Sequence, residues 1–235
     1  MKSFLLFLFF STISIIAYGQ TTTYYVNKTA TAGLNNGTSW ANAFTNLQSA
    51  MDTASAGDAI WVAAGTYSPT AAPDGSNTNS RDRAFHLNKN LKIYGGFDGT
   101  ETMLSERDWK NNSTILSGDF NGDDVVSGSS LTISNTTENA YHVFITTGLN
   151  STTLIDGFTM KGGNADSSSI ISYDGRNFFR YFGGGMYNIS SSPRISNTTF
   201  SGNVANFDGG GMYNRSSSPS ITNSTFSGNR ANNNG

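Results

Sequence analysis

The C-terminal part of the chain repeats itself every 26 residues, and this period limits the possible folds more than any other feature. Gly183-Gly184-Gly185-Met186-Tyr187-Asn188 recurs as Gly209-Gly210-Gly211-Met212-Tyr213-Asn214, and Phe200-Ser201-Gly202-Asn203 recurs as Phe226-Ser227-Gly228-Asn229. A β-propeller blade needs roughly 40–45 residues, and a leucine-rich repeat needs a Leu/Asn consensus that is missing here. Helical repeats would show a 3.6-residue apolar period, which is also missing. The period therefore predicts a parallel β-helix in which each repeat forms one coil.

An earlier, degenerate copy of the repeat precedes these two. Leu154 to Ala165 matches Arg194 to Ala205 at an offset of 40 residues, which is one repeat plus a 14-residue insertion between Asp166 and Phe182. Further upstream, short apolar runs bounded by Gly, Asn or Asp are typical of strands. These predicted strands are Ala59 to Val62, Leu91 to Tyr94, Thr114 to Leu116, Leu131 to Ile133 and His142 to Thr146.

Stacked coils would place equivalent residues about 4.8 Å apart, so that identical side chains form ladders. We expect about three strands in each coil, with apolar ladders pointing inward and amide ladders at the corners. Glycine triplets would allow tight corners and close contact between coils. The expected apolar ladders are Ile195/Ile221, Met186/Met212 and Phe200/Phe226, and the expected amide ladders are Asn188/Asn214, Asn197/Asn223 and Asn203/Asn229.

The composition agrees with a narrow core and excludes several functions. Only 13% of residues are charged and 36% are hydrophobic, with a net charge of −2. A chain without a basic cluster is not expected to bind nucleic acid. The absence of Cys excludes disulfides, thiolate zinc sites and a cysteine nucleophile.

The N-terminus has the pattern of a secretory signal peptide at residues 1–19. Lys2 precedes an apolar run from Phe4 to Ile16, and Ala17-Tyr18-Gly19 offers small residues for cleavage. The run is about 13 residues long, whereas a membrane span needs about 20, so a membrane anchor is the less favoured alternative. We expect a secreted or cell-surface protein with no transmembrane segment after cleavage. Export without Cys is typical of bacterial envelopes.

Residues 20–58 are predicted to form an N-terminal cap. Apolar residues from Ser39 to Ala54 recur at helical spacing, with Ser39 as N-cap and Gly57 as the stop. Such an amphipathic helix would cover the open end of the coils, which are expected over residues 59–235. The sequence stops inside a repeat and without a polar cap, so we expect a C-terminally truncated chain.

Two motifs carry a resemblance to known families. The segment from Leu47 to Tyr67, with Ala56-Gly57-Asp58-Ala59-Ile60-Trp61-Val62, resembles the cap and first coil of pectate-lyase-like right-handed parallel β-helix proteins. The Gly-Gly-Gly-Met and Phe-Ser-Gly-Asn repeats are similar to the GGAI and FxxN repeats of polymorphic outer membrane proteins, with Met in place of Ile. The whole pattern resembles large exported β-helix proteins of Bacteroidetes-type bacteria. The resemblance implies an all-β, right-handed, single-stranded parallel β-helix with an N-terminal capping helix.

One loop has the residue types of a calcium site. Asp119, Asn121 and Asp123 place oxygen atoms at alternate positions around Gly122, as calcium loops do. An EF-hand would need a Glu where Ser130 stands, and a polar turn with Asx hydrogen bonds is the favoured alternative. Calcium is the one cofactor that we consider.

The 14-residue insertion is the best candidate for a functional loop. It contains Tyr173, Asp174 and Arg176, and with Tyr181 and Phe182 it offers aromatic and charged groups for a glycan. The alternative, which we favour, is that these aromatic residues only cover the flank of the solenoid. His86 and His142 are isolated in the sequence and are expected to be packing residues.

These observations predict an exported cell-surface repeat protein with a non-catalytic role in adhesion or in contact with glycans or other cells. Near-perfect repetition favours this role or a passive structural one, because an active site requires coils that differ. The alternative is a polysaccharide lyase or glycoside hydrolase whose catalytic coils lie mostly outside this sequence, since enzymes of this fold resemble one another in using clustered Asp with Arg or Lys.

Overall fold

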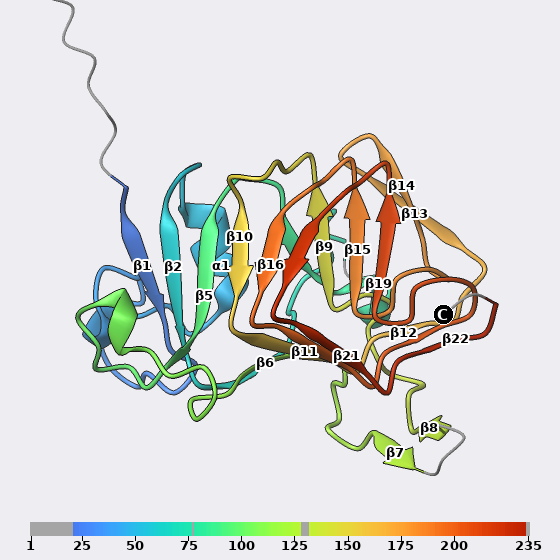
Figure 1. The fold of residues 1–235 in the computed structure, drawn as a ribbon, viewed down its shortest axis with the longest axis horizontal. Coiled ribbons are helices and arrows are strands. Elements are labelled where there is room, and N and C mark those ends of the chain that lie inside the picture. Colours follow the sequence, from blue (N-terminus) through green and yellow to red (C-terminus); the bar gives the residue numbers. More distant parts are fainter. Residues whose placement is uncertain (1–20, 77, 128–131, 234–235) are drawn as a thin grey trace, which may run out of the picture.

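The chain winds as a parallel β-solenoid in which successive coils stack on one another (Figure 1). This computed structural model describes residues 21–76, 78–127 and 132–233. Within each stack of strands all pairings are parallel, and the strands recur in sequence order. The parallel β-helix predicted from the 26-residue period is thus confirmed. The predicted signal peptide, residues 1–19, lies outside the described residues.

Among the described residues, four parallel sheets run along the solenoid, and we name each by its first strand in the sequence. The β1 sheet contains β1 (Thr23–Val26), β2 (Ala59–Ala63), β5 (Lys92–Phe97), β10 (Leu154–Asp156), β16 (Arg194–Ser196) and β20 (Ser220–Thr222). The β3 sheet contains β3 (Gly65–Tyr67), β6 (Thr114–Ser117), β11 (Phe158–Lys161), β17 (Thr199–Ser201) and β21 (Thr225–Ser227). The β4 sheet contains β4 (Phe85–Leu87), β9 (Phe144–Thr147), β15 (Met186–Ile189) and β19 (Met212–Arg215), and the short β12 sheet contains β12 (Asn164–Ala165), β18 (Val204–Ala205) and β22 (Arg230–Ala231).

The offsets between sequence repeats equal the offsets between paired residues of neighbouring strands. Phe200 of β17 pairs with Phe226 of β21, 26 residues later in the sequence. On its other side it pairs with Met160 of β11, 40 residues earlier. The Phe200 and Phe226 rings stack with centroids 4.6 Å apart and planes 7° apart. One repeat contains four strands, β16 to β19, rather than the expected three. The inward rows form one continuous core, which includes the pair Ile155/Ile195 and the pair Met186/Met212. Ile195 also pairs with Ile221, which is exposed in the last coil.

Asparagine side chains join neighbouring coils. In each case the Nδ2 of one Asn donates to the Oδ1 of its equivalent, as in Asn188/Asn214 (2.8 Å), Asn203/Asn229 (2.9 Å) and Asn223/Asn197. Asn197 and Asn223 lie at corners, with φ of 50° and 47°. Asn188 and Asn214 lie inside β15 and β19, so their expected corner position is wrong. Their row instead continues along the β4 sheet to Thr146, whose hydroxyl donates to Asn188.

Asn203 is the amide whose loss should cost most, because it is fully buried. Its Nδ2 donates to the carbonyl of Met160, and its Oδ1 accepts from the amide of Gly163, both at 3.0 Å. An unsatisfied buried group costs roughly 1–3 kcal/mol, so Asn203→Ala should lower the free energy of unfolding by about 2–4 kcal/mol in urea denaturation. Asn206→Ala removes an exposed amide of the same solenoid and should cost less than about 1 kcal/mol. Equal losses in both variants would contradict this role of Asn203.

The helix predicted from Ser39 to Ala54 is wrong in extent. Instead, the segment contains two short helices, η1 (Trp40–Asn42) and α1 (Leu47–Thr53). Between them, Phe44 forms a parallel β-bridge with Val26 of β1. The amide of Phe44 donates to the carbonyl of Tyr25, and this pairing takes the segment out of helical geometry. Asn46 caps α1 by accepting from two of its amides, at 2.7 and 3.3 Å. Leu47, Ala50 and Met51 are buried in the core beside the first coils.

In the part of the chain that the structure describes, two antiparallel hairpins leave the coils. Two further short helices of this part, η2 (Ser80–Asp82) and η3 (Leu104–Glu106), lie in loops. β7 (Val125–Ser127) pairs with β8 (Thr132–Ser134), and Figure 1 shows them apart from the stacked sheets. Of the strand predicted at Leu131 to Ile133, Leu131 lies outside the described residues, and Thr132 and Ile133 belong to this hairpin rather than to a coil. β13 (Ile170–Tyr173) and β14 (Arg176–Phe179) form the second hairpin, which is the predicted insertion.

Candidate functional site

The β13–β14 hairpin lies against the outer side of the β4 sheet. Its turn is Asp174-Gly175, with φ of 51° and 65°, as a tight hairpin turn requires. This dipeptide, flanked by aromatic and β-branched residues, was the sequence signal that could have predicted the hairpin. On the inner face, Tyr173 and Phe178 stack with ring centroids 4.1 Å apart and pack with Tyr187 of the coil below. The hairpin is therefore seated on the solenoid by buried aromatic rings.

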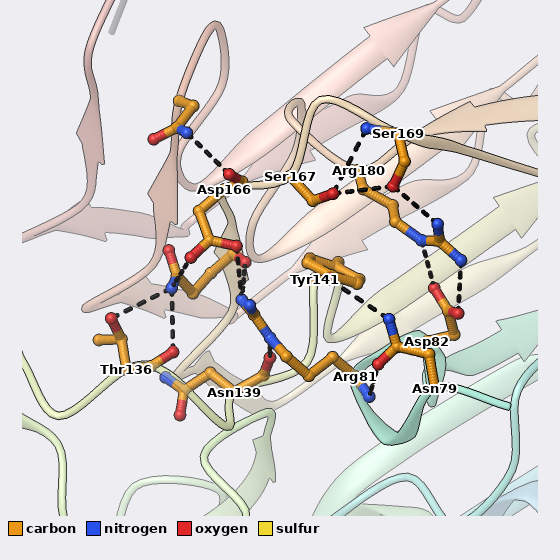
Figure 2. A network of polar contacts seen from close by, with 12 residues as sticks. Asn79, Arg81, Asp82, Thr136, Asn139, Tyr141, Asp166, Ser167, Ser169 and Arg180 are labelled. Atoms are coloured by element: carbon orange, nitrogen blue, oxygen red, sulfur yellow. Dashed lines mark hydrogen bonds and ion pairs between the residues drawn. The ribbon is translucent and has the colours of Figure 1, made fainter. Parts of the chain in front are cut away.

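A polar network fixes the base of the hairpin (Figure 2). Arg180 forms a two-point ion pair with Asp82, with Nε–Oδ1 at 2.6 Å and Nη2–Oδ2 at 2.5 Å. Arg81 pairs with Asp166 at 2.7 Å. The ring of Tyr141 contacts both guanidinium groups, at 4.2 Å from Arg81 and 5.4 Å from Arg180. Because these contacts join η2 to the insertion, they determine where the two ends of the hairpin lie.

The tip of the hairpin borders a pocket of about 590 Å³. Tyr173 and Asp174 line it, together with residues of α1, of loop 71–75 and of β4. Arg176 lies beside it and donates to the Asp174 carboxylate at 2.7 Å. The ring of Tyr173 is only 7% exposed, so it offers no free face on which a sugar could stack. Other pocket residues, among them Asp52, Asp74 and His86, were not predicted, because nothing in the sequence places them near the insertion.

The base of the hairpin carries a second feature, which we call the aromatic platform: Tyr181, Phe182, Phe207 and Tyr213. Phe182 stacks on Tyr213 with centroids 4.4 Å apart and planes 7° apart. Tyr181 contacts Phe207 at 5.3 Å, and Phe207 is 48% exposed. The sequence pattern did not predict Phe207 and Tyr213 as site residues. Phe207 follows Tyr181 by one 26-residue repeat, and this was the signal that could have found it.

The structure thus divides the predicted glycan-binding residues between two places. Tyr173, Asp174 and Arg176 lie at the tip, beside the pocket. Tyr181 and Phe182 lie at the base, in the aromatic platform. Buried rings connect the two places, because Tyr173, Phe178 and Tyr187 belong to one hydrophobic cluster against which Phe182 packs.

The loop considered for calcium forms an Asx-type turn. The Asp119 Oδ1 accepts from the amides of Gly122 (2.6 Å) and Asp123 (3.3 Å). Asp119, Asp123 and Asp124 offer carboxylate oxygens within 4.8 Å of one another. Asn121 is exposed. Asp124, which follows Asp123 directly in the sequence, was not predicted as part of this loop's carboxylate group.

Burial raises the pKa of the Asp124 carboxyl to about 6, although a hydrogen bond from Asn139 opposes this shift. The neighbouring carboxylates of Asp119, Glu138 and Asp123 raise it further. The repulsion between these groups is what a cation would relieve. Calcium binding here stays a prediction.

Two further titratable side chains, His142 and Asp156, are held in buried contacts. Burial lowers the pKa of His142 to about 4, and its Nδ1 lies 3.0 Å from the carbonyl oxygen of Gly183. Asp156 is buried in an ion pair with Arg107 and accepts from Asn197 at 2.9 Å. A lyase or hydrolase activity stays an alternative prediction.

Comparison of the chain with protein-family models, with curated proteins and with solved structures finds no significant match in any of the three. Among the described residues, no helix has the length and hydrophobicity needed to cross a bilayer.

Proposed function

We propose that this chain is an exported, non-catalytic surface protein that binds glycans through the aromatic platform. The observation that carries the proposal is the grouping of four aromatic rings from adjacent coils on one flank, with Phe207 nearly half exposed. Exposed apolar patches that monomers retain mark interaction sites more often than isolated surface residues do. The signal-peptide pattern of residues 1–19 supports export to the cell surface.

The geometry of the platform suits a sugar chain. Pyranose rings present an apolar C–H face, which packs on an aromatic ring while the hydroxyl groups stay in water. Tyr181 and Phe207 occupy equivalent positions in adjacent coils, so their backbones are separated by about one strand spacing, roughly 4.8 Å. This spacing is comparable with the length of one sugar residue. Consecutive sugars along a chain would therefore meet successive aromatic residues.

The test is a glycan array followed by titration of the intact protein with the strongest ligand. Tyr181→Ala and Phe207→Ala should each weaken binding about tenfold, because aromatic anchors contribute most of the energy in such contacts. Phe207→Ala is the cleaner variant, since its side chain is the more exposed and its loss should least disturb the fold.

Phe120→Ala is the matched control, because Phe120 is a half-buried ring on a different loop, where it contacts Arg83. This variant should bind normally. Glycan binding that survives both platform substitutions would overturn the role of the platform. Formation of unsaturated sugar products, seen as new ultraviolet absorbance, would overturn the non-catalytic assignment.

A further inference from the structure

The outer face of the β3 sheet carries two adjoining hollows, which together we call the β3 groove. One hollow, of about 300 Å³, lies beside Trp109 and is lined by Thr159 and Thr199. The other, also of about 300 Å³, is lined by Ser201 and lies beside Val126 of β7. Strands β11 and β17 run under both hollows, and Figure 1 shows β7 on the side of the β3 sheet. Together the hollows reach the size of small-ligand sites.

The loop that carries Trp109 is fixed against the coils. The amide of Asp108 donates to the carbonyl of Gly96 at 2.8 Å. A Cβ atom at Gly96 would lie 2.4 Å from the Cα of Trp109, so glycine allows the loop to approach this closely. The Asp108 carboxylate accepts from the amides of Lys110 and Asn111 and closes the turn. The half-buried indole is therefore held in place before any ligand binds, which lowers the entropy cost of binding.

The hydroxyl groups of the groove floor point out of the solenoid. Met160 and Phe200 are fully buried in the core, so the residues beside them in the strands face outward. Thr159 pairs with Thr199 of the neighbouring strand, and this pairing places their backbones about 4.8 Å apart. Ser201 follows Thr199 on the same face of β17, at roughly 6.6 Å. The floor is thus a small regular array of hydroxyl groups.

The polar groups of the groove are accessible and free to bind a ligand. In the described part of the chain, the hydroxyls of Thr159, Thr199 and Ser201 form no hydrogen bond with the protein, and other atoms do not enclose them. The same holds for the indole N–H of Trp109. Asn197 also lines the groove, but its amide is already engaged by other side chains and is not counted. A half-exposed indole with a free N–H is typical of interaction sites.

The groove carries charges of both signs. Lys161 and Asp124 line its end at β7. At the other end, Lys110 lies close to the carboxylate of Asp108. Because neither sign is in surplus, a ligand with many hydroxyl groups and no net charge complements the groove better than an ionic ligand does.

We propose that the β3 groove binds an uncharged, extended glycan chain, with one sugar on the exposed part of the Trp109 indole and the sugar hydroxyls on the hydroxyls of the floor. The apolar C–H face of a pyranose packs on the indole. Each hydroxyl donates and accepts, so sugar and floor hydroxyls pair in either direction. The floor rows run straight along the stacked coils, and an extended chain follows them better than a curved one. The site does not depend on the aromatic platform and gives the protein a second glycan-binding face.

The test is calorimetric titration of the Phe207→Ala protein, in which the aromatic platform is impaired and the groove is intact. The probes are cellohexaose, an extended uncharged chain; maltohexaose, a curved chain of the same sugar; and hexagalacturonate, a charged chain. We expect cellohexaose to bind at least tenfold more tightly than either of the others. Equal binding of maltohexaose would overturn the extended fit, and equal or tighter binding of hexagalacturonate would overturn the preference for an uncharged chain. No binding of cellohexaose overturns the whole proposal.

Substitutions in the same background locate the site. Trp109→Ala should weaken cellohexaose binding at least tenfold, because aromatic anchors contribute most of the energy in such contacts. Thr199→Val removes one floor hydroxyl while keeping a β-branched side chain that suits a strand, and it should weaken binding severalfold. Its matched control is Thr23→Val, since Thr23 is also a half-buried strand residue but lies on β1, outside the groove; this variant should bind normally.

The unfolding midpoint of each variant is measured beside its affinity. If Trp109→Ala lowers this midpoint, Thr199→Val decides the question, because it keeps the loop intact. Binding that survives both substitutions would overturn the groove as the site. Equal weakening by Thr23→Val would overturn the role of the floor hydroxyls.

Discussion

Replacing Arg180 with Met should lower the free energy of unfolding by about 3–5 kcal/mol, as measured by urea denaturation. Arg180 holds Asp82 through two hydrogen bonds of 2.6 and 2.5 Å, and the Asp82 side chain is only 2% exposed. Without the guanidinium group, the carboxylate of Asp82 stays buried without its counter-charge. The contact of Arg180 with the ring of Tyr141 is lost as well.

Two further variants test the cause of this loss. Arg176→Met breaks an exposed ion pair, whose side chains are 32% and 54% exposed, and should cost less than about 1 kcal/mol. The double variant Asp82→Leu with Arg180→Met removes both charges and should recover part of the stability that Arg180→Met loses. If the double variant is less stable than Arg180→Met, the buried unpaired charge is not the reason for the loss.

Gly184→Ala should destabilise the solenoid by at least about 3 kcal/mol, above the usual cost of overpacking. A Cβ atom at this position would lie 2.2 Å from the carbonyl oxygen of Val204 and 2.9 Å from that of Gly210. Both are backbone atoms, of β18 and of the loop before β19, so no side-chain rotation can relieve the clash. The stacked coils would have to separate locally, and hydrogen bonds between them would be lost.

Gly57→Ala is the control for this substitution. Gly57 has φ of 97°, and a Cβ atom there would meet nothing within 4 Å. The Gly57→Ala variant measures how much stability an unfavourable backbone conformation costs without any clash, about 1–2 kcal/mol. Thermal unfolding followed by circular dichroism compares the two variants. A Gly184→Ala protein that is as stable as the Gly57→Ala protein would show that the coils do not need this close contact.

The glycine triplets show how far the sequence pattern explained the stacking. Gly183 and Gly209 have positive φ, 67° and 70°, as the corner interpretation requires. Gly184 and its equivalent Gly210 are instead required by close contact between coils, because a Cβ atom would meet backbone oxygens there. The sequence predicted both roles for the glycine triplet, a tight corner and close contact between coils. It did not predict which of the three glycines has which role.

The prediction for the N-terminal helix failed for a physical reason. The apolar spacing from Ser39 to Ala54 is helical, but Phe44 gains hydrogen bonds with β1 that a helix would not provide. A tertiary pairing therefore replaced the local preference over part of the segment. The apolar residues that follow, Leu47 and Met51, are still buried on a helix, as their spacing implied.

The sequence alone determined the solenoid and its register. A fixed period places like residues one strand spacing apart, so the Phe200/Phe226 stack and the Asn203/Asn229 contact follow from the offset of 26. Only the tertiary structure decided the candidate sites. The pocket beside the hairpin tip joins α1, loop 71–75, β4 and the hairpin turn, which are far apart in the sequence and follow no common period. Their approach depends on how the insertion folds back over the coils, and that is set by the buried contacts of Tyr173 and by the Arg180–Asp82 ion pair rather than by any local pattern.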